Sequence, residues 1–363
     1  MIVAGQRRRT IWPAAEADAV YIIDQRGLPH RWLELRLTDI AEVHAAIRSM
    51  AVRGAPLIGA TAAYGLALQC RHQATDAALQ AAKAFLDNAR PTAVNLAWAT
   101  QRMLDALAPI ALDERCAAAW AEAGAIADED VAVNESIGEH GLALLRRLAA
   151  AKPADAPLQV LTHCNAGWLA TVDWGTALAP VYKAQAAGLA VHVWVDETRP
   201  RNQGASLTAW ELGQQGVPFT LIADNAGGHL MQRGQVDVVL VGADRVAANG
   251  DVCNKIGTYL KALAAHDNGV PFYVAMPLSS FDATLGDGRA EIPIEERAAR
   301  ELTHIAGLDD KGEMTEVQLA PAGCNALNPA FDVTPARLVG GLITERGIVA
   351  AQAAALQALV GAA

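Results

Sequence analysis

The chain has 363 residues, of which 52% are hydrophobic and 19% charged, and its formal net charge at pH 7 is −10. This composition excludes an intrinsically disordered chain, and the length is sufficient for a large buried core, with about two domains expected. The acidic balance argues against binding to nucleic acid or to an anionic membrane surface, although a few basic residues in one pocket would still suit an anionic substrate.

Cysteine usage and the hydrophobic runs indicate the compartment. The five cysteines are scattered and include no C-x-x-C pair, which argues against a disulfide framework and favours a reducing cytosol. No cluster of histidine, cysteine and carboxylate residues has the spacing of metal ligands. The segment Met1–Arg9 is not followed by the apolar region of a signal peptide, and no apolar run has membrane-spanning length. We therefore expect a soluble, cytoplasmic protein.

The first part of the chain predicts a short β segment followed by helices. The runs Val20–Asp24 and Trp32–Leu37 flank the turn-like Gly27–Pro29, as in a hairpin. A capped amphipathic helix is expected from about Asp39. Further helices are expected at roughly residues 56–71, 74–88, 93–109 and 113–150. This pattern predicts a mainly helical N-terminal domain over residues 1–150.

Strands alternate with helices from the breaker-rich link at 152–157 to about residue 350. Five expected strands are short, predominantly apolar runs: Leu158–Thr162, Ala190–Val195, Pro218–Ala223, Val236–Val241 and Pro271–Ala275. Such runs are typical of buried parallel strands, and their alternation with helices is typical of βαβ units. The fold class predicted is therefore α/β, with a Rossmann-like, doubly wound parallel sheet in a C-terminal domain of residues 151–363.

Polar residues follow four of these five strands, and ligands of open α/β sheets bind beyond the carboxyl ends of the strands. The G-x-G-x-x-G fingerprint is missing after the first of these strands, which argues against a nicotinamide dehydrogenase. Cys164 and Asp244 each follow a predicted strand and are the candidates for chemistry. The sequence therefore predicts a site at this edge of the sheet.

Cys164 and Asp244 each allow a functional and a structural interpretation. A thiol that faces a helix start gains acidity from the backbone N–H groups there, but a free cysteine is more often a small buried residue. Partial burial would raise the pKa of Asp244 into the range of a general acid, but Asp244 could also cap a helix or pair with Arg245. The neighbouring His163 is expected to be a hydrogen-bonded core histidine.

Several basic and polar residues would suit an anionic sugar ligand. Arg53 and Arg90 each precede a proline at an expected helix start, and Gly54 would let the backbone approach a ligand closely. Lys255, at another expected helix start, could hold a phosphate. Gln203 can hydrogen-bond sugar hydroxyls. For each charged residue alone, a solvated surface position is an equally simple interpretation.

Taken together, these segments resemble the aldose-ketose isomerases related to the alpha, beta and delta subunits of translation initiation factor 2B. The matching motifs follow the family order over about residues 10–350. They are Arg53-Gly54-Ala55-Pro56-Leu57-Ile58-Gly59, Arg90-Pro91-Thr92, Thr162-His163-Cys164-Asn165-Ala166-Gly167, Glu197-Thr198-Arg199-Pro200, Gln203-Gly204-Ala205, Gly242-Ala243-Asp244-Arg245, Asn254-Lys255-Ile256-Gly257-Thr258 and Phe331-Asp332-Val333-Thr334-Pro335.

The resemblance implies that Cys164 and Asp244 form a catalytic pair, with Asp244 the proton donor. The substrate-binding residues that it implies are Arg53, Gly54, Ala55, Arg90, Gln203, Asn254 and Lys255. It implies no metal or organic cofactor, and a homodimer. The implied reaction converts 5-methylthioribose 1-phosphate to 5-methylthioribulose 1-phosphate in methionine salvage. Isomerases of 5-deoxyribose 1-phosphate or ribose 1,5-bisphosphate, and a non-catalytic regulatory subunit, remain alternatives.

Two departures from the family pattern leave the C5 substituent of the substrate open. Ser206 stands where the family often has arginine, which removes one positive charge near the expected site. The segment Asp224–His229 replaces an Asn-Met-Ala type of sequence. Both segments lie near predicted strand ends.

Overall fold

The computed structural model describes residues 1–90, 94–153 and 155–361. The predicted motif residues Pro91 and Thr92, the predicted helix start at residue 93, residue 154 of the predicted link and the last two residues of the chain lie outside this part.

The N-terminal part forms a small sheet followed by helices, as predicted. Strands β3 (Ile11–Pro13), β4 (Val20–Ile23) and β5 (Glu34–Leu37) pair antiparallel, so the expected hairpin is confirmed and gains a third strand. Before them, β1 (Ile2–Val3) pairs with β2 (Gln6–Arg7). The helices that follow are α1 (Ile40–Arg48), α2 (Ala55–Cys70), α3 (Asp76–Asp87), α4 (Val94–Leu107) and α5 (Arg115–Ala149).

Helix α2 lies at the centre of this part and is apolar around most of its circumference, which is the pattern of a fully buried helix. Helices α1, α3, α4 and α5 all pack against it. Pro56 occupies its first turn, where proline costs no hydrogen bond. The buried start of α2 fixes the preceding residue pair, Arg53 and Gly54, at the edge of the C-terminal sheet.

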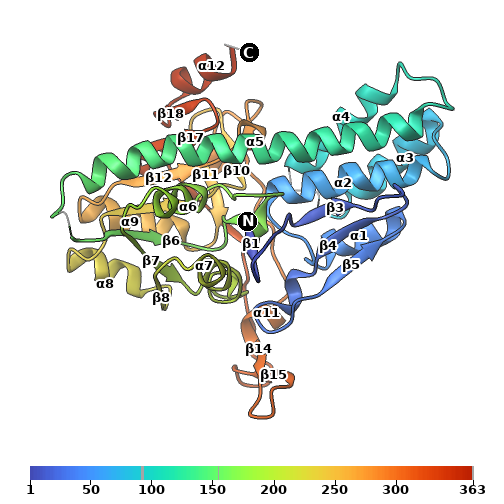
Figure 1. The fold of residues 1–363 in the computed structure, drawn as a ribbon. Helices are drawn as coiled ribbons and strands as arrows, with labels where there is room; N and C mark the ends of the chain where they lie inside the picture. Colours follow the sequence, from blue (N-terminus) through green and yellow to red (C-terminus); the bar gives the residue numbers. More distant parts are fainter. Residues whose placement is uncertain (91–93, 154, 362–363) are drawn as a thin grey trace.

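A seven-stranded sheet forms the centre of the C-terminal part (Figure 1). Its strands are β6 (Leu158–Thr162), β7 (Val191–Asp196), β8 (Phe219–Ile222), β9 (Val238–Val241), β12 (Phe272–Ala275), β17 (Gly341–Thr344) and β18 (Gly347–Val349). Their order is β18-β17-β12-β9-β6-β7-β8, with β18 antiparallel and the others parallel. The parallel strands thus follow the 3-2-1-4-5-6 order of a doubly wound sheet, which confirms the predicted fold class.

The strand order reverses between β6 and β9, and this is the point at which ligands of doubly wound sheets bind. Cys164 follows β6 and Asp244 follows β9. The two candidate residues therefore leave adjacent strands at the topological switch point.

A second sheet interrupts the predicted alternation. Strands β13 (Phe281–Asp282), β10 (Arg245–Ala247), β11 (Val252–Lys255) and β16 (Phe331–Thr334) form it in that order. Lys255 therefore ends a strand, and the predicted helix start there is wrong. Helix α9 begins at Thr258 instead, after Gly257. The strand escaped prediction because it is short and its four residues are buried, so it shows no alternation.

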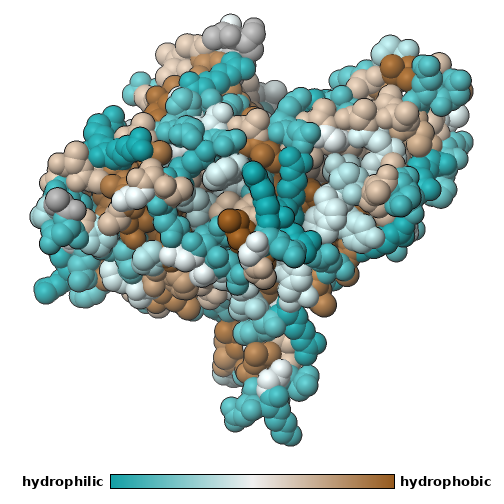
Figure 2. Space-filling model, in the orientation of Figure 1, coloured by the Kyte–Doolittle hydropathy of each residue, from teal (hydrophilic) through white to brown (hydrophobic). Residues whose placement is uncertain are grey.

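The remaining helices are α6 (Ala179–Ala186), α7 (Ala209–Gln215), α8 (Ala226–Gln232), α9 (Thr258–Asp267), α10 (Gly288–Glu291), α11 (Arg300–Thr303) and α12 (Ala353–Gly361). Strands β14 (His304–Leu308) and β15 (Met314–Gln318) form a hairpin that projects from the body of the molecule, and hydrophobic residues lie on its surface (Figures 1 and 2).

Within the described ranges, no helix is both long and apolar enough to cross a membrane.

Helix α5 runs along both parts of the chain (Figure 1). Its first half packs against α2, and its second half packs against α6 and β17. The domain boundary at residue 150 falls just after this helix and stays a prediction. Gly141 allows the close contact with α6, because a Cβ there would lie 2.6 Å from Cβ of Pro180.

We expect Gly141→Ala to lower the free energy of unfolding by about 1–3 kcal/mol, because α5 and α6 would have to separate. Gly124 lies in the same helix, and a Cβ there would meet no atom within 4 Å. Gly124→Ala is the matched control and should stabilise the protein by about 0.5–1 kcal/mol. Thermal unfolding should therefore give Tm shifts of opposite sign, and equal shifts would contradict this account of the α5–α6 contact.

Candidate active site

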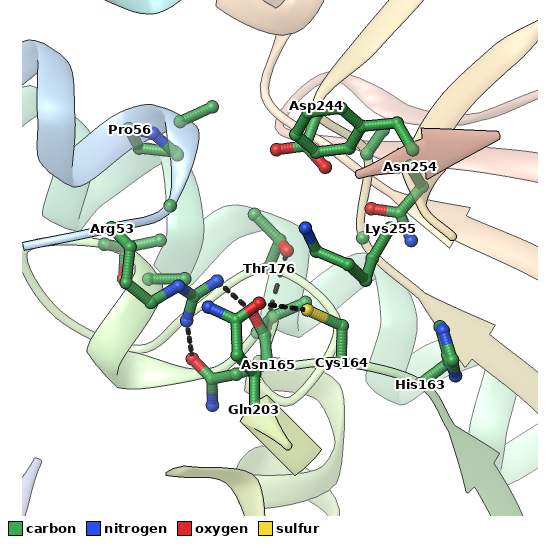
Figure 3. Close-up of a pocket in the computed structure, with 18 of the residues that line it drawn as sticks. Arg53, Pro56, His163, Cys164, Asn165, Thr176, Gln203, Asp244, Asn254 and Lys255 are labelled. Carbon is green, nitrogen blue, oxygen red and sulfur yellow. Dashed lines mark hydrogen bonds between the residues drawn. The ribbon is translucent and has the colours of Figure 1, made fainter. Parts of the chain in front are cut away.

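All nine residues implied by the resemblance line one cavity beyond the carboxyl ends of β6 and β9. They are Arg53, Gly54, Ala55, Arg90, Cys164, Gln203, Asp244, Asn254 and Lys255. Figure 3 shows Arg53 approaching from the N-terminal part while Cys164, Asp244 and Lys255 come from the C-terminal part. The cavity therefore lies between the start of α2 and the edge of the sheet.

Cys164 is held in an unusual backbone conformation with its thiol inside the cavity. Its φ of +66° lies in the left-handed region, and its backbone N–H donates to Oγ1 of Thr198 at 2.8 Å. The carbonyl of Cys164 accepts from Oγ1 of Thr208 at 2.7 Å. The Sγ atom donates to Oε1 of Gln203 at 3.3 Å. Two threonine hydroxyls thus fix the backbone, and Gln203 orients the thiol.

The predicted gain of acidity at Cys164 is wrong. Burial raises the pKa of its thiol, and this outweighs the opposing effect of the Arg53 and Lys255 charges. No α-helix begins directly after Cys164; the first helical residues there form the 3-10 turn η2 (Trp168–Ala170). Burial therefore favours the neutral thiol over the thiolate.

Asp244 faces the same cavity and is partly exposed to it. Burial within the protein raises the pKa of its carboxyl, against the opposing effects of Lys255, Arg90 and Arg53. Its backbone N–H donates to the carbonyl of Cys253 at 2.9 Å, and strand β10 follows directly. The helix-cap interpretation is therefore wrong, and a carboxyl that holds its proton at higher pH suits a proton donor.

Two buried cations give the cavity an excess of positive charge. Arg53 and Lys255 are 7% and 8% exposed, so the surface interpretation is wrong for both. In the part of the chain that the structure describes, no carboxylate lies within 4.0 Å of either cation. The Nζ atom of Lys255 lies 4.4 Å from the ring centre of Phe331, and burial lowers the pKa of Lys255. Because buried charges need partners, the cavity is suited to an anion.

Arg90 also lines the cavity, and its side chain is 12% exposed. Its Nη2 lies 3.2 Å from a carboxylate oxygen of Glu295. The surface interpretation is therefore wrong for Arg90 as well. Unlike Arg53 and Lys255, however, Arg90 already has a carboxylate partner, because its Nη2 pairs with Glu295.

The other implied residues have defined neighbours. Gly54 has a φ of +92°, and a Cβ there would lie 2.5 Å from Cα of Ala170. The glycine therefore allows the start of α2 to pack against η2, and it also lines the cavity, so its role in ligand approach stays a prediction. Nδ2 of Asn254 donates to Oγ1 of Thr258 at 3.0 Å. Ser206, the family departure, donates from Oγ to the carbonyl of Asn202 at 2.8 Å.

His163 is a hydrogen-bonded core histidine, as predicted. Its Nδ1 lies 2.8 Å from Oδ2 of Asp196, and its Nε2 lies 2.8 Å from the carbonyl oxygen of Ile256. His163, Asp196 and Asp224 together have a geometry that could hold a metal ion. Their sequence spacing gave no sign of this, because the ends of three strands bring them together. The ammonium of Lys261 already lies 3.1 Å from Asp196 and supplies a positive charge there.

Sequence reasoning missed the roles of Asn165, which lines the cavity, and of Glu211, which lies behind it. Asn165 binds Arg53 through its side-chain and backbone oxygens, and Glu211 binds Asn165 in turn. Asn165 was visible as the neighbour of Cys164, but no local pattern distinguishes Glu211 from other helical glutamates.

Comparisons with known proteins show the family to which the chain belongs. The initiation factor 2 subunit family matches residues 51–351. A methylthioribose-1-phosphate isomerase from Rhodospirillum rubrum is 61% identical over 363 residues, which cover 99% of this chain and 93% of that protein. The isomerase of the same name from Methylocella silvestris is 61% identical over 99% of this chain and 98% of its own length.

Solved structures show the same fold. The crystal structure of 5-methylthioribose 1-phosphate isomerase from Pyrococcus horikoshii OT3 matches with a TM-score of 0.85 and 41% identity, covering 99% of this chain and 97% of the other. The structure of the translation initiation factor eIF-2B subunit delta from A. fulgidus matches with a TM-score of 0.78 and 40% identity over 95% and 96% of the chains. This protein therefore belongs to the initiation factor 2 subunit family.

Proposed function

We propose that this protein isomerises 5-methylthioribose 1-phosphate to 5-methylthioribulose 1-phosphate. The observation that carries the proposal is the cavity at the switch point, in which a thiol and a carboxyl face two buried cations that have no carboxylate within 4.0 Å among the described residues. Relatives named methylthioribose-1-phosphate isomerase, 56–61% identical over nearly the whole chain, support this choice of substrate.

The substrate sets a specific chemical problem. Its anomeric oxygen carries the phosphate, so the sugar ring cannot open to a free aldehyde. The bond between C1 and the ring oxygen must break, and one hydrogen must move from C2 to C1. In our proposal Asp244 delivers a proton to the ring oxygen as this bond breaks. Cys164 acts at C2.

The remaining cavity residues bind the substrate in this proposal. Arg53, Arg90 and Lys255 neutralise the phosphate, since charge-assisted hydrogen bonds to phosphate are among the strongest in proteins. Gly54 and Ala55 lie at the start of α2, and Gln203 and Asn254 supply amides for sugar hydroxyls. An enclosed cavity discourages exchange with water, which favours a hydride shift from C2 to C1 over an enolate route.

We expect kcat/KM to be highest for 5-methylthioribose 1-phosphate among three substrates. Loss of the methylthio group in 5-deoxyribose 1-phosphate should lower kcat/KM by about 10–100-fold, the usual discrimination from a small apolar group. A preference for ribose 1,5-bisphosphate would contradict the proposed substrate, and no turnover of any of the three would favour a regulatory protein. Substantial deuterium at product C1 after reaction in deuterated water would exclude the hydride shift.

The proposal also places the protein in methionine salvage, in the cytoplasm, as a homodimer. These assignments rest on the resemblance of its motifs to the isomerases. Sedimentation equilibrium should give twice the mass of one chain, and the mass of a single chain would contradict the dimer.

A further inference from the structure

We infer that Asn165 is a positioning residue that holds the Arg53 guanidinium in the cavity, and that Glu211 fixes Asn165 for this task. The inference rests on the proposed function in one respect, namely that Arg53 binds the phosphate of the substrate.

Arg53 is held by a single residue. Its Nη1 donates to Oδ1 of Asn165, and its Nη2 donates to the backbone carbonyl of Asn165 at 2.6 Å. Its Nε is buried and has no hydrogen-bond partner among the described residues. Asn165 thus anchors both terminal nitrogens of the guanidinium beside the cavity (Figure 3).

The amide of Asn165 has only one orientation that satisfies its neighbours. Its Nδ2 donates to Oε1 of Glu211 and to Oγ1 of Thr208, the latter at 3.1 Å. An ionised carboxylate only accepts hydrogen bonds and a guanidinium only donates them. Oδ1 of Asn165 must therefore face Arg53, because the Thr208 hydroxyl already donates to the carbonyl of Cys164 and needs the Asn165 N–H as its donor, and Glu211 in its ionised form enforces the same orientation.

Glu211 is in turn fixed behind the cavity wall. It is 1% exposed, and its Oε2 accepts from the hydroxyl of Tyr182 at 3.0 Å. A Cβ on Gly167 would lie 2.5 Å from Cδ of Glu211, so the glycine makes room for the carboxylate. Burial raises the pKa of Glu211 to about 7, against the opposing hydrogen bonds from Asn165 and Tyr182. No lysine or arginine lies within 4.0 Å of this carboxylate in the described part of the chain, so Asn165 is its link to a positive charge.

A double-mutant cycle with inorganic phosphate as the probe tests the inference. Calorimetric titration should show that Asn165→Ala weakens phosphate binding about tenfold, because one of two anchors of Arg53 is lost while the backbone anchor stays. In the Arg53→Ala background, Asn165→Ala should have no further effect, because it acts through Arg53. Additive effects of the two substitutions would overturn the inference, and so would failure of the wild type to bind phosphate.

Two further variants distinguish the positioning role from a failure of Asn165→Ala to fold and from a general structural effect. Glu211→Gln preserves the shape of the side chain and serves if Asn165→Ala does not fold; it should weaken phosphate binding less, and only when Arg53 is present. Asn134 is the matched control, since it is equally buried, donates to Asp130, and is not among the residues that line the cavity. Asn134→Ala should leave the Kd for phosphate unchanged, and an equal loss there would indicate a general structural effect.

Turnover separates this inference from the proposed function. With 5-methylthioribose 1-phosphate, Asn165→Ala should raise KM much more than it lowers kcat. A wild type that binds phosphate and shows the non-additive cycle, but turns over no substrate, would refute the proposed function alone. A wild type that turns over the substrate while the effects add would refute the positioning role alone.

Discussion

Replacing Asp244 by asparagine should lower kcat by roughly 10²–10⁴-fold, the usual contribution of a general acid. Asparagine keeps the size of the side chain but cannot deliver a proton to the ring oxygen. Phosphate affinity should change little, because the cationic side chains are untouched. Steady-state kinetics with 5-methylthioribose 1-phosphate measures the effect, and near-normal turnover would eliminate Asp244 as the donor.

The pH profile gives a second measure of the same role. A donor must be protonated, and burial raises the pKa of Asp244, so the active form persists to higher pH than for an ordinary aspartate. In the wild type, kcat/KM should fall as the pH rises through this pKa, and the residual activity of Asp244→Asn should lack that fall. Asp237 precedes the same strand β9 at its opposite end, where it accepts from the backbone N–H of Gln159 at 2.7 Å. Asp237→Asn is the matched control and should keep both kcat and the pH profile.

Replacing Cys164 by serine should also reduce kcat by at least about 10²-fold. A hydroxyl can still donate to Gln203, but it ionises far less readily than a thiol, so chemistry at C2 that needs a base or nucleophile is lost. Cys70 is an equally buried thiol in α2, remote from the cavity, and Cys70→Ser controls for the loss of a buried sulfur. It should lower Tm without changing kcat. Equal losses of kcat in the two variants would argue against a catalytic thiol.

Local sequence patterns were sufficient for most of the framework. The apolar run Leu158–Thr162 is strand β6 as predicted, and the predicted helix over residues 56–71 is α2. The strand is apolar enough, and the helix long enough, for the spacing of hydrophobic residues and the helix- or strand-breaking residues at the ends to identify each element as a strand or a helix. The strand ends then indicated where a site should lie. Lys255 was misplaced on a helix because the short strand β11 has no alternating pattern.

The sequence motifs identified as candidates the nine residues that line the cavity. They gave no information on whether these side chains are buried or on which residues they form hydrogen bonds with. Spacing alone favoured a structural role for Cys164, and a surface position was an equally simple interpretation for Arg53 and Lys255. The tertiary structure decided these points, because it brings Arg53 to Asn165 across 112 positions and Glu211 to Asn165 across 46 positions. Burial raises or lowers a pKa only through such contacts between distant segments, and no local periodicity encodes them. The sequence by itself therefore determined the fold class and nominated the residues that line the cavity, and the tertiary structure decided their charge environment.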